Sequence, residues 1–364
     1  MAPAAQLGVE LAVRPRAWRA RWDRLVGALE RLLAGGYPPA VALAVVERDG
    51  PVLSAWGGFA CTLGEPVPLE RTTLFDLASL TKVVATVPLA LLLAERGAWD
   101  LADPVRSYVP GYPRPDVTLR HLLTHTSGLV AHRPFFETLR GRAAIRAAVL
   151  AEAAHGGPTG DVVYSDLNFM LLGWALEARG GARLDRLVRD GVTRPLQMAK
   201  TRFTPPPTLR RRCAATELDG DQRNEPGLVW GVVHDGNAAA LGGIAGHAGL
   251  FAPLGDMIRF VRPLLDTARH PVLSVGSLAM LSRRSAATGG DVRSIGWRLA
   301  PEGWGDWPVG TYWHTGFTGT SLLVAPGSGV AVVCLTNGVH PARRPEDQAR
   351  VRAELHALVA EAYR

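Results

Sequence analysis

A serine and a lysine stand three residues apart, at Ser79 and Lys82, where a long apolar stretch begins. Side chains three residues apart share one face of a helix, so these two groups would be within reach of each other. A serine hydroxyl is a weak nucleophile at neutral pH, and a lysine amine can activate it when its surroundings lower the lysine pKa. The N-terminus of a helix adds backbone N–H groups and a partial positive charge. The pair therefore predicts covalent catalysis, and the alternative is a helix-capping serine followed by a lysine that reaches to solvent.

The use of lysine in this chain favours the catalytic interpretation. Of 40 basic residues, only Lys82 and Lys200 are lysines, and the others are arginines. Arginine does not give up its proton in proteins and could not act as a base. A chain that uses arginine almost everywhere thus has lysine at the position where a base is needed.

Two further short motifs carry groups that would complete such a site. The first is Tyr164-Ser165-Asp166, at a predicted loop-to-helix junction, where a tyrosine hydroxyl between two cations could shuttle a proton. Its alternative is a core tyrosine followed by an aspartate N-cap. The second is His314-Thr315-Gly316 on a predicted strand, where the next backbone N–H would form an oxyanion hole with the N–H of Ser79. Its alternative is a strand with a glycine bulge.

These three motifs, in this order, resemble the serine β-lactamase and penicillin-binding-protein superfamily. The nearer branch comprises class C β-lactamases and related D-aminopeptidases, esterases and peptidoglycan amidases. Ser-x-x-Lys matches at Ser79 and Lys82, Tyr-x-Asn appears with an aspartate as its third residue, and Lys-Thr-Gly appears in its His-Thr-Gly form. The similarity spans roughly residues 20–364 and includes three other familial stretches, at residues 101–105, 121–129 and 246–251.

The resemblance implies a role for each of these residues. Ser79 attacks a carbonyl and forms an acyl-enzyme that water later hydrolyses, while Lys82 and Tyr164 share the general-base work and the tyrosine protonates the leaving group. The N–H groups of Ser79 and Phe317 hold the oxyanion. His314 orients this network, or binds a substrate carboxylate when it is charged. The residues assigned to substrate binding are Asp166, Thr315 and Gly316, and no metal or cofactor is implied.

Two departures from the family pattern affect this chemistry. Histidine in place of lysine at position 314 weakens permanent binding of a carboxylate, which argues against efficient β-lactam turnover. Aspartate at position 166 brings a negative charge near Lys82 and Tyr164. That charge would keep the lysine protonated unless the carboxylate of Asp166 is turned away.

The sequence therefore predicts a serine hydrolase that acts on an amide or an ester. The expected substrate is a small molecule or a peptidoglycan fragment, namely a muropeptide, a small ester or a β-lactam. Some similar proteins cleave the amide between N-acetylmuramic acid and the stem peptide during wall recycling. The alternative is a catalytically weak or inactive sensor on the same fold, which Asp166 and His314 suggest.

The composition excludes several other classes of protein. The net charge is +7, but the arginines are spread among nearly as many acids and no run of five basic residues occurs, so nucleic-acid binding is not expected. Three widely spaced cysteines predict neither a disulfide framework nor a zinc ribbon. His121 and His125 have metal-ligand spacing but lack the His-Glu-x-x-His pattern, so no metal is expected.

The expected location is cytoplasmic. The first residues show no basic segment followed by an apolar core, so we predict no secretory signal. The longest mainly apolar run, residues 83–94, is about a dozen residues long and contains Pro88. It predicts a buried core helix rather than a membrane span. The sequence leaves the oligomeric state open.

The elements that must position these groups predict an α+β fold. An amphipathic helix over residues 17–34 precedes a hairpin over residues 40–59, and strands return from residue 295 before a last helix. We expect an antiparallel sheet flanked by N- and C-terminal helices, formed by residues 17–78 and 287–364. Residues 79–286 would form an inserted, all-helical lobe, with the active site in the cleft between the two. A flexible arm is expected at residues 1–16 and a long surface loop at residues 200–232.

Overall fold

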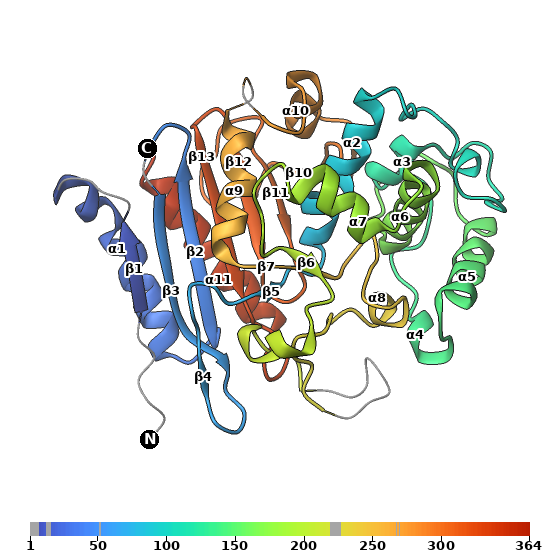
Figure 1. The fold of residues 1–364 in the computed structure, drawn as a ribbon. Coiled ribbons are helices and arrows are strands. Elements are labelled where there is room, and N and C mark those ends of the chain that lie inside the picture. Colours follow the sequence, from blue (N-terminus) through green and yellow to red (C-terminus); the bar gives the residue numbers. More distant parts are fainter. Residues whose placement is uncertain (1–6, 12–15, 51, 219–226, 267, 269) are drawn as a thin grey trace.

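The computed structural model describes residues 7–11, 16–50, 52–218, 227–266, 268 and 270–364. Within them, one antiparallel sheet has ten strands, in the order β1-β3-β2-β13-β12-β11-β10-β9-β8, with β4 paired to β3 (Figure 1). These strands are β1 (Leu7–Leu11), β2 (Ala40–Glu47), β3 (Val52–Cys61), β4 (Val67–Pro68), β8 (Ala286–Thr288), β9 (Asp291–Arg293), β10 (Arg298–Leu299), β11 (Tyr312–Thr315), β12 (Ser321–Ala325) and β13 (Val330–Thr336). The α+β class with an antiparallel sheet is confirmed.

A small second sheet and the helices make up the rest of the described chain. The small sheet has the order β5-β7-β6, with β5 (Phe75–Asp76), β6 (Arg202–Phe203) and β7 (Leu250–Ala252). The α-helices are α1 (Arg16–Ala34), α2 (Val87–Glu95), α3 (Leu119–Leu123), α4 (Phe135–Thr138), α5 (Arg142–Ala154), α6 (Asp166–Gly180), α7 (Leu184–Val188), α8 (Gly236–Ala240), α9 (Leu254–Leu265), α10 (Val275–Ser282) and α11 (Pro345–Glu361). Two π-helical turns, η1 (Lys82–Thr86) and η3 (Arg189–Thr193), and two 3₁₀ turns, η2 (Val105–Ser107) and η4 (Pro207–Arg212), complete them.

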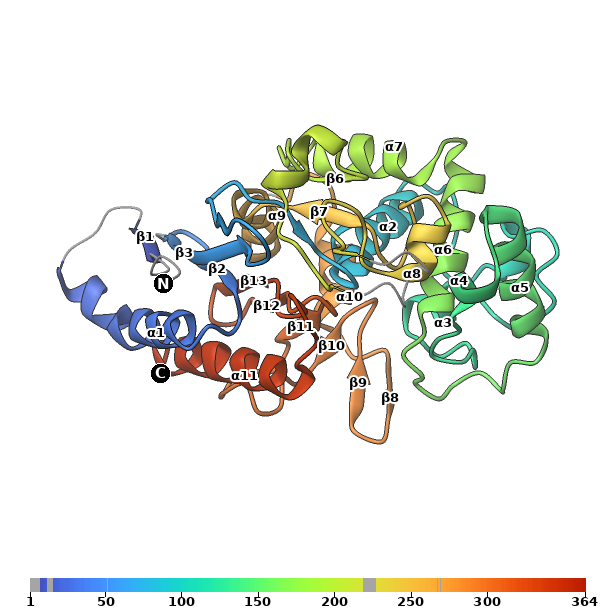
Figure 2. The ribbon, with the colours of Figure 1, turned by 90° about the horizontal axis from the view of Figure 1, so that it is seen from below.

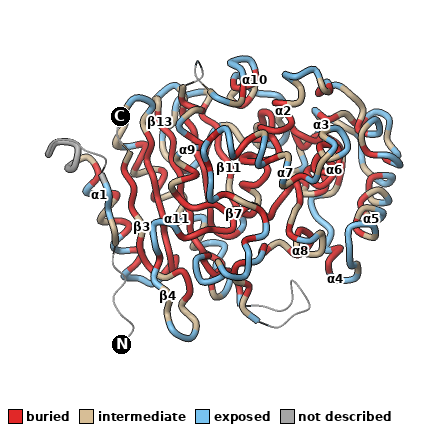
Figure 3. The backbone as a smooth tube through the Cα atoms, in the orientation of Figure 1, coloured by how far each residue is buried: buried red, intermediate tan, exposed pale blue. Residues whose placement is uncertain are grey.

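The large sheet is covered on both faces. Helices α1 and α11 lie side by side on one face, and α9 packs on the other against β2, β12 and β13 (Figure 2). Alternate residues of a strand point to opposite faces, so β2 supplies both layers. Val41, Leu43 and Val45 join the core under α1 and α11, while Ala40, Ala42, Ala44 and Val46 join the core under α9. The central strands are therefore buried along almost their whole length (Figure 3).

The helical region is built around α6, whose residues from Leu167 to Leu176 are all buried. Helix α6 packs closely against the small-residue segment around Gly246. The backbone of Gly246 lies against Phe169 and Gly173 of the helix. The carbonyl of Gly246 also accepts a hydrogen bond from Thr86 Oγ1 at 2.6 Å. This segment thus joins α6 to η1, which carries Lys82.

The structure differs from the sequence-based expectations in several places. Leu7–Leu11 of the expected arm forms β1, paired with β3, whereas residues 1–6 and 12–15 lie outside the described residues. The expected loop at residues 200–232 is partly core, because Cys213 and Ala215 are buried; residues 219–226 are not described. Hairpin β8–β9 was not anticipated. The predicted core helix over residues 83–94 begins as a π-helical turn just before Pro88, since proline has no N–H to donate.

The division into two lobes remains a proposal. Residues 79–286 hold most of the helices, but they also contribute strands β6 and β7 and the sheet-covering helix α9. In Figure 1 the helical region lies to the right of the large sheet, and Ser79 belongs to the segment that leads from β5 into that region. Across the described ranges, no helix is both long and apolar enough to cross a membrane.

We predict that Gly246→Ala destabilises the protein because no space exists for a side chain there. A Cβ at this position would stand 2.1 Å from the Phe169 carbonyl oxygen and 3.0 Å from the Gly173 nitrogen. Backbone atoms on α6 cannot move aside cheaply, so we expect a loss of about 3 kcal/mol, measured as a lower midpoint of urea unfolding.

Gly27→Ala is the matched control. It lies inside α1, where a Cβ would meet only the flexible end of Arg31, at 3.5 Å. Alanine is the better helix former, so this variant should be as stable as the parent or more stable. Equal midpoints for the two variants would contradict the close approach of Gly246 to α6.

Candidate active site

Ser79 stands at the end of a strained turn that follows β5. Ala78 precedes it with φ of +46°, a left-handed conformation that costs an alanine roughly 1–2 kcal/mol. The Asp76 carboxylate stabilises the turn, since its Oδ1 accepts the Ala78 N–H at 2.8 Å. Its Oδ2 accepts the N–H of His234 at 2.6 Å. The sequence thus builds a rigid turn that presents Ser79 at the start of the helical stretch.

Lys82 contacts Ser79 directly, as the three-residue spacing predicts. Its side chain is fully buried, and its Nζ donates to Ser79 Oγ at 2.9 Å, to Asp166 Oδ1 at 2.8 Å and to the His247 carbonyl at 3.2 Å. An ammonium group has three hydrogens, so every donor has an acceptor. The buried group is therefore satisfied as a cation.

The charges of Lys82 and Asp166 stabilise each other. Burial alone would lower the pKa of Lys82, but the Asp166 carboxylate and the Tyr164 side chain outweigh it and raise the pKa above its ordinary value. Burial likewise would raise the pKa of Asp166, but the Lys82 charge and the His132 hydrogen bond hold it far below its usual range. The carboxylate of Asp166 is not turned away, so Lys82 rests in its protonated form.

Asp166 was expected to bind substrate, but both of its oxygens contact groups of the protein. Oδ1 pairs with Lys82, and Oδ2 lies 3.5 Å from Nδ1 of the half-exposed His132. The hydrogen bond to Asp166 raises the pKa of His132. The structure thus assigns Asp166 to the lysine, and His132 is a neighbour of the site that the sequence did not indicate.

Tyr164 lies among His314, Lys82 and Arg293. Lys82 Nζ is 5.0 Å from the centroid of its ring and the guanidinium carbon of Arg293 is 5.2 Å from it. The rings of His125 and His314 approach it to 4.6 and 5.8 Å. Two cations, Lys82 and Arg293, thus lie near the Tyr164 ring.

His125 fixes the loop that carries Tyr164. Its Nδ1 accepts the N–H of Ser165 at 3.1 Å and lies 3.3 Å from the Asn168 amide nitrogen. Its backbone φ is +58°, and its ring is fully enclosed. Burial, Arg293 and Lys82 lower its pKa well below the usual value, so it stays neutral. Sequence alone gave no sign that this histidine supports the tyrosine.

His314 is on β11 and is a neutral acceptor rather than a cation. Its Nδ1 lies 2.8 Å from the Thr315 carbonyl, which can only accept, so Nδ1 carries the proton. Its Nε2 is buried and has no partner within the described residues. Burial, Lys82 and Arg293 lower the pKa of His314 well below its usual value. A neutral His314 favours the first expected role, which is to orient the network, over binding of a carboxylate, and its free lone pair can accept a hydrogen bond.

Arg293, at the end of β9, is a site residue that the sequence did not single out. Its side chain is 3% exposed, and its Nη2 donates to Asp291 at 2.7 Å. Its Nε and Nη1 are buried without a partner within the described chain. Hairpin β8–β9 reaches the loop before Tyr164, where the Val162 N–H donates to Thr288 Oγ1 at 3.1 Å. Among so many arginines, no pattern marks this one, because only the hairpin brings it to the site.

The turn after β11 is fastened to the segment before Ser79. Thr318 Oγ1 donates to the Asp76 carbonyl at 2.7 Å, and Thr320 Oγ1 donates to the Leu77 carbonyl at 3.2 Å. A Cβ at Gly316 would stand 2.5 Å from the Leu77 oxygen, so only glycine fits this approach. Thr315 precedes it, half-buried at the end of β11.

Two backbone N–H groups near the nucleophile have no hydrogen-bond acceptor within the described residues. Within the described residues, neither Ser79 N–H nor Phe317 N–H donates a hydrogen bond. Because the threonine contacts hold their two segments together, both groups belong to one site, as an oxyanion hole requires.

The two histidines with metal-ligand spacing point to different partners. His121 Nδ1 accepts the Thr118 N–H at 3.1 Å, at the start of α3, and His125 supports the tyrosine loop. Among the residues that the structure describes, no group of three His, Cys, Asp or Glu side chains could hold a metal ion.

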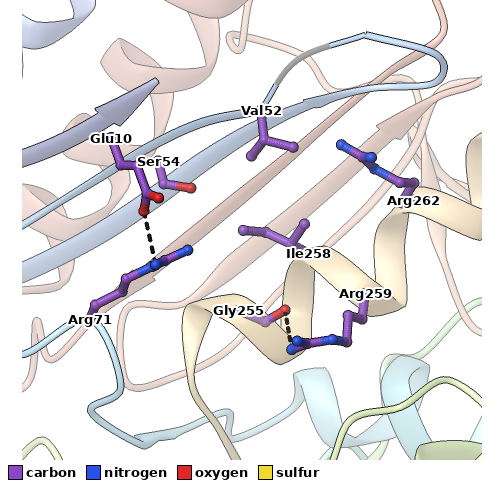
Figure 4. Close-up of a pocket in the computed structure, with 8 residues that line it drawn as sticks. All are labelled: Glu10, Val52, Ser54, Arg71, Gly255, Ile258, Arg259 and Arg262. Atoms are coloured by element: carbon purple, nitrogen blue, oxygen red, sulfur yellow. Dashed lines mark hydrogen bonds and ion pairs between the residues drawn. The ribbon is translucent and has the colours of Figure 1, made fainter. Parts of the chain in front are cut away.

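A hollow of about 400 Å³ opens elsewhere, between β1, β3 and α9 (Figure 4). None of the residues discussed above lines it. Two of the three arginines that line it form ion pairs: Arg71 with Glu10 at 3.0 Å, and Arg259 with Asp256 at 3.1 Å. We therefore place the chemistry at Ser79 rather than in this hollow.

Comparison with known proteins agrees with the fold and with the family resemblance. The family model described as Beta-lactamase matches residues 26–357. A putative D-alanyl-D-alanine carboxypeptidase of Escherichia coli (strain K12) is 28% identical over 351 residues, which cover 84% of this chain and 79% of that protein.

Two solved structures share the architecture at lower identity. The hydrolase EstCE1, described as having promiscuous acyltransferase activity, superposes with a TM-score of 0.76 and 20% identity, over 95% of this chain and 100% of that one. A class C beta lactamase from Rhodobacter sphaeroides superposes with a TM-score of 0.72 and 21% identity, over 93% and 98% of the two chains. These likenesses show the fold.

We predict that Asp166→Ala destabilises the protein by about 3–5 kcal/mol, because it leaves the Lys82 ammonium buried and unpaired. The double variant Lys82→Met/Asp166→Leu should recover most of this loss, since it removes both charges and keeps the volume. Urea unfolding at pH 7 measures both. A double variant no more stable than the single one would contradict this account.

The exposed pair Arg189–Asp190 supplies the control, and Asp190→Ala should leave the unfolding midpoint unchanged.

The stability that Asp166 contributes depends on pH with a defined sign. Because folding lowers the pKa of Asp166, its contribution is present above the ordinary aspartate pKa of about 3.9 and is lost as the pH falls below it. The stability difference between the parent and Asp166→Ala should therefore shrink on acidification.

Proposed function

This chain belongs to the Beta-lactamase family and is a serine hydrolase, and from that premise we propose that Ser79 is its nucleophile. The observation that carries the proposal is the 2.9 Å hydrogen bond from the fully buried Lys82 Nζ to Ser79 Oγ. Ser79 attacks the carbonyl carbon of an amide or ester and forms an acyl-enzyme. Water then attacks the same carbon and releases the acid.

The state of Lys82 defines its part in this reaction. As an ammonium group paired with Asp166, it donates to Ser79 Oγ and stabilises the negative charge that develops on that oxygen. Tyr164 accepts the proton of the serine while it passes its own hydroxyl proton to the departing amine or alcohol, so that the tyrosine ends the step neutral. Lys82 and Arg293, both near the Tyr164 ring, stabilise negative charge that develops at this position during the proton transfer.

The oxyanion of the tetrahedral intermediate is held by the N–H groups of Ser79 and Phe317. Both lack other partners within the described chain, and their segments are joined through Thr318 and Thr320. The unpartnered Nε2 of His314 accepts a hydrogen bond from the substrate or from the tyrosine hydroxyl. Thr315 and Gly316 border the path of the substrate along β11.

Arg293 favours a substrate that has a carboxylate near its scissile bond. Its two unpartnered guanidinium nitrogens are buried beside Tyr164, and an anion there would satisfy them. The carboxypeptidase name of the 28% identical relative fits this chemistry. We propose a peptide that ends in a free carboxylate as the substrate, with peptidoglycan fragments as its natural source.

A cytoplasmic setting and amidase activity belong to the same proposal. The described cysteines, Cys61, Cys213 and Cys334, are all free thiols, which suits a reducing compartment. There the enzyme would meet soluble wall fragments rather than the intact wall.

A second candidate function is a sensor that binds such ligands without turnover. The specific observation in its favour is the Lys82–Asp166 ion pair, which prevents the lysine from acting as a base. Such a protein would acylate slowly and keep its acyl group, or bind without acylation.

We predict that a fluorophosphonate probe and a fluorescent penicillin label the parent protein and that Ser79→Ala abolishes both labels. Ser328→Ala, in an exposed turn, is the matched control and should be labelled like the parent. Gel fluorescence of the full chain measures this. Labelling that persists in Ser79→Ala would exclude Ser79 as the nucleophile. Repeated turnover of a p-nitrophenyl ester would exclude the sensor, whereas one turnover per molecule would favour it.

We predict that Arg293→Met raises KM at least tenfold for a peptide with a free C-terminal carboxylate, because the anion loses its charged partner. The same peptide with an amidated C-terminus should show no such change. Arg298→Met is the matched control, since Arg298 also pairs with Asp291 but stacks on Trp313. Equal effects on the acid and the amide would show that Arg293 does not recognise the carboxylate.

A further inference from the structure

Arg352, on α11, reaches Gly316, the residue that follows β11. Its Nη2 donates to the carbonyl oxygen of Gly316 at 2.5 Å, across 36 residues of sequence. Its Nε is buried without another partner within the described residues, and burial lowers its pKa. Helix α11 covers the sheet face opposite to α9, next to α1 (Figure 2).

The bonded carbonyl belongs to the peptide that supplies half of the oxyanion hole. Gly316 C=O and Phe317 N–H are the two ends of a single peptide group, which is not among the cis bonds of the structure. In a planar trans peptide the C=O and N–H bonds point in opposite directions. A contact that holds the Gly316 oxygen toward α11 therefore points the Phe317 N–H away from α11, while the bonds from Thr318 and Thr320 hold the segment before Ser79 against the same turn.

This peptide needs a device that fixes its orientation. Glycine rotates freely about its backbone bonds, so the bond after Gly316 offers little resistance to a flip of the peptide plane. A flip would replace the Phe317 N–H by a carbonyl oxygen and would repel an oxyanion. Its other contacts are to the turn itself: the Gly319 N–H donates to the same oxygen at 3.1 Å, and the Gly316 N–H donates to Thr320 O at 2.7 Å.

The charge of Arg352 strengthens the hydrogen bond that orients this peptide. A guanidinium donor forms a stronger hydrogen bond than a neutral donor. It also polarises the peptide, because electron density drawn toward the bonded oxygen leaves the N–H at the other end a better donor. One buried cation can thus both orient and strengthen the group that meets the developing negative charge.

We propose that Arg352 is a positioning residue of the oxyanion hole: it holds the Gly316–Phe317 peptide with its N–H directed at the reacting carbonyl oxygen. This inference rests on the proposed function, because it assumes that Ser79 attacks that carbonyl. Arg352 does not touch the substrate. It acts through the peptide, from a helix on the other side of the sheet.

The test compares Arg352→Met with Arg350→Met, an exposed arginine of the same helix that pairs with Asp347 at 3.0 Å. Removing one oxyanion donor outright costs enzymes roughly 100- to 1,000-fold in kcat, and here the donor is only released. We expect kcat for a p-nitrophenyl ester to fall about 10- to 100-fold in Arg352→Met, with KM within about threefold of the parent. Arg350→Met should match the parent.

A boronic acid inhibitor separates positioning from general structural damage. It forms a tetrahedral adduct whose oxygen occupies the oxyanion hole, so its affinity should fall by a factor close to that in kcat. Arg352→Lys keeps a charged donor and should give a kcat between those of Arg352→Met and the parent. It also provides the comparison if the methionine variant does not fold, which circular dichroism establishes first.

The proposal is overturned if kcat of a folded Arg352→Met equals that of the parent, or if boronate affinity is unchanged while kcat falls. A lysine variant as impaired as the methionine variant would also overturn it. Failure of the proposed function has a different signature. In that case Ser79→Ala would retain probe labelling and esterase activity, whatever the Arg352 variants show.

Discussion

The structure around Ser79 depends on one buried ion pair. Lys82 lies in the interior with no access to water, and Asp166 offsets the cost of burying its charge. The Tyr-x-Asn motif that this segment resembles has a neutral asparagine in place of Asp166, so the ion pair affects the chemistry as well as the stability. It holds Lys82 as an ammonium group that donates to the nucleophile. In the proposed mechanism the proton is moved by Tyr164, whose ring lies near that same lysine.

Three segments far apart in the sequence meet at this pair, and each is held by contacts that the motifs themselves do not contain. The turn before Ser79 is stabilised by Asp76, whose backbone oxygen also accepts from Thr318 after β11. The tyrosine loop is held by His125. The oxyanion peptide is approached from behind by Arg352 of α11. A motif of three residues is thus functional only when the layers of the sheet on both faces are assembled.

The polar groups near the nucleophile comprise the Lys82–Asp166 ion pair, one further cation, Arg293, and two neutral histidines. Lys82 and Arg293 carry charge, and burial beside them keeps His125 and His314 neutral. Neutral histidines can accept hydrogen bonds without adding to the positive charge, and Asp166 matches the charge of Lys82, which leaves Arg293 as the cation proposed to attract an anionic substrate. The family pattern assigns carboxylate binding to a lysine of the third motif. Here a histidine occupies that place, and the nearby arginine of β9 has the charge and the free nitrogens for the task.

The sequence by itself determined the fold class, most of the helices and strands, and the pairing of Ser79 with Lys82. Ser79 and Lys82 were predictable because a three-residue helical spacing is local, and the strands and the long helices were predictable because their apolar periodicity is local as well. The order of the motifs predicted site roles for Tyr164, His314 and Phe317. Only the tertiary structure decided where the Asp166 carboxylate points, that His314 is neutral, and that Arg293 and Arg352 reach the site. Each of those depends on burial and on contacts between elements distant in sequence, and no short-range pattern encodes them.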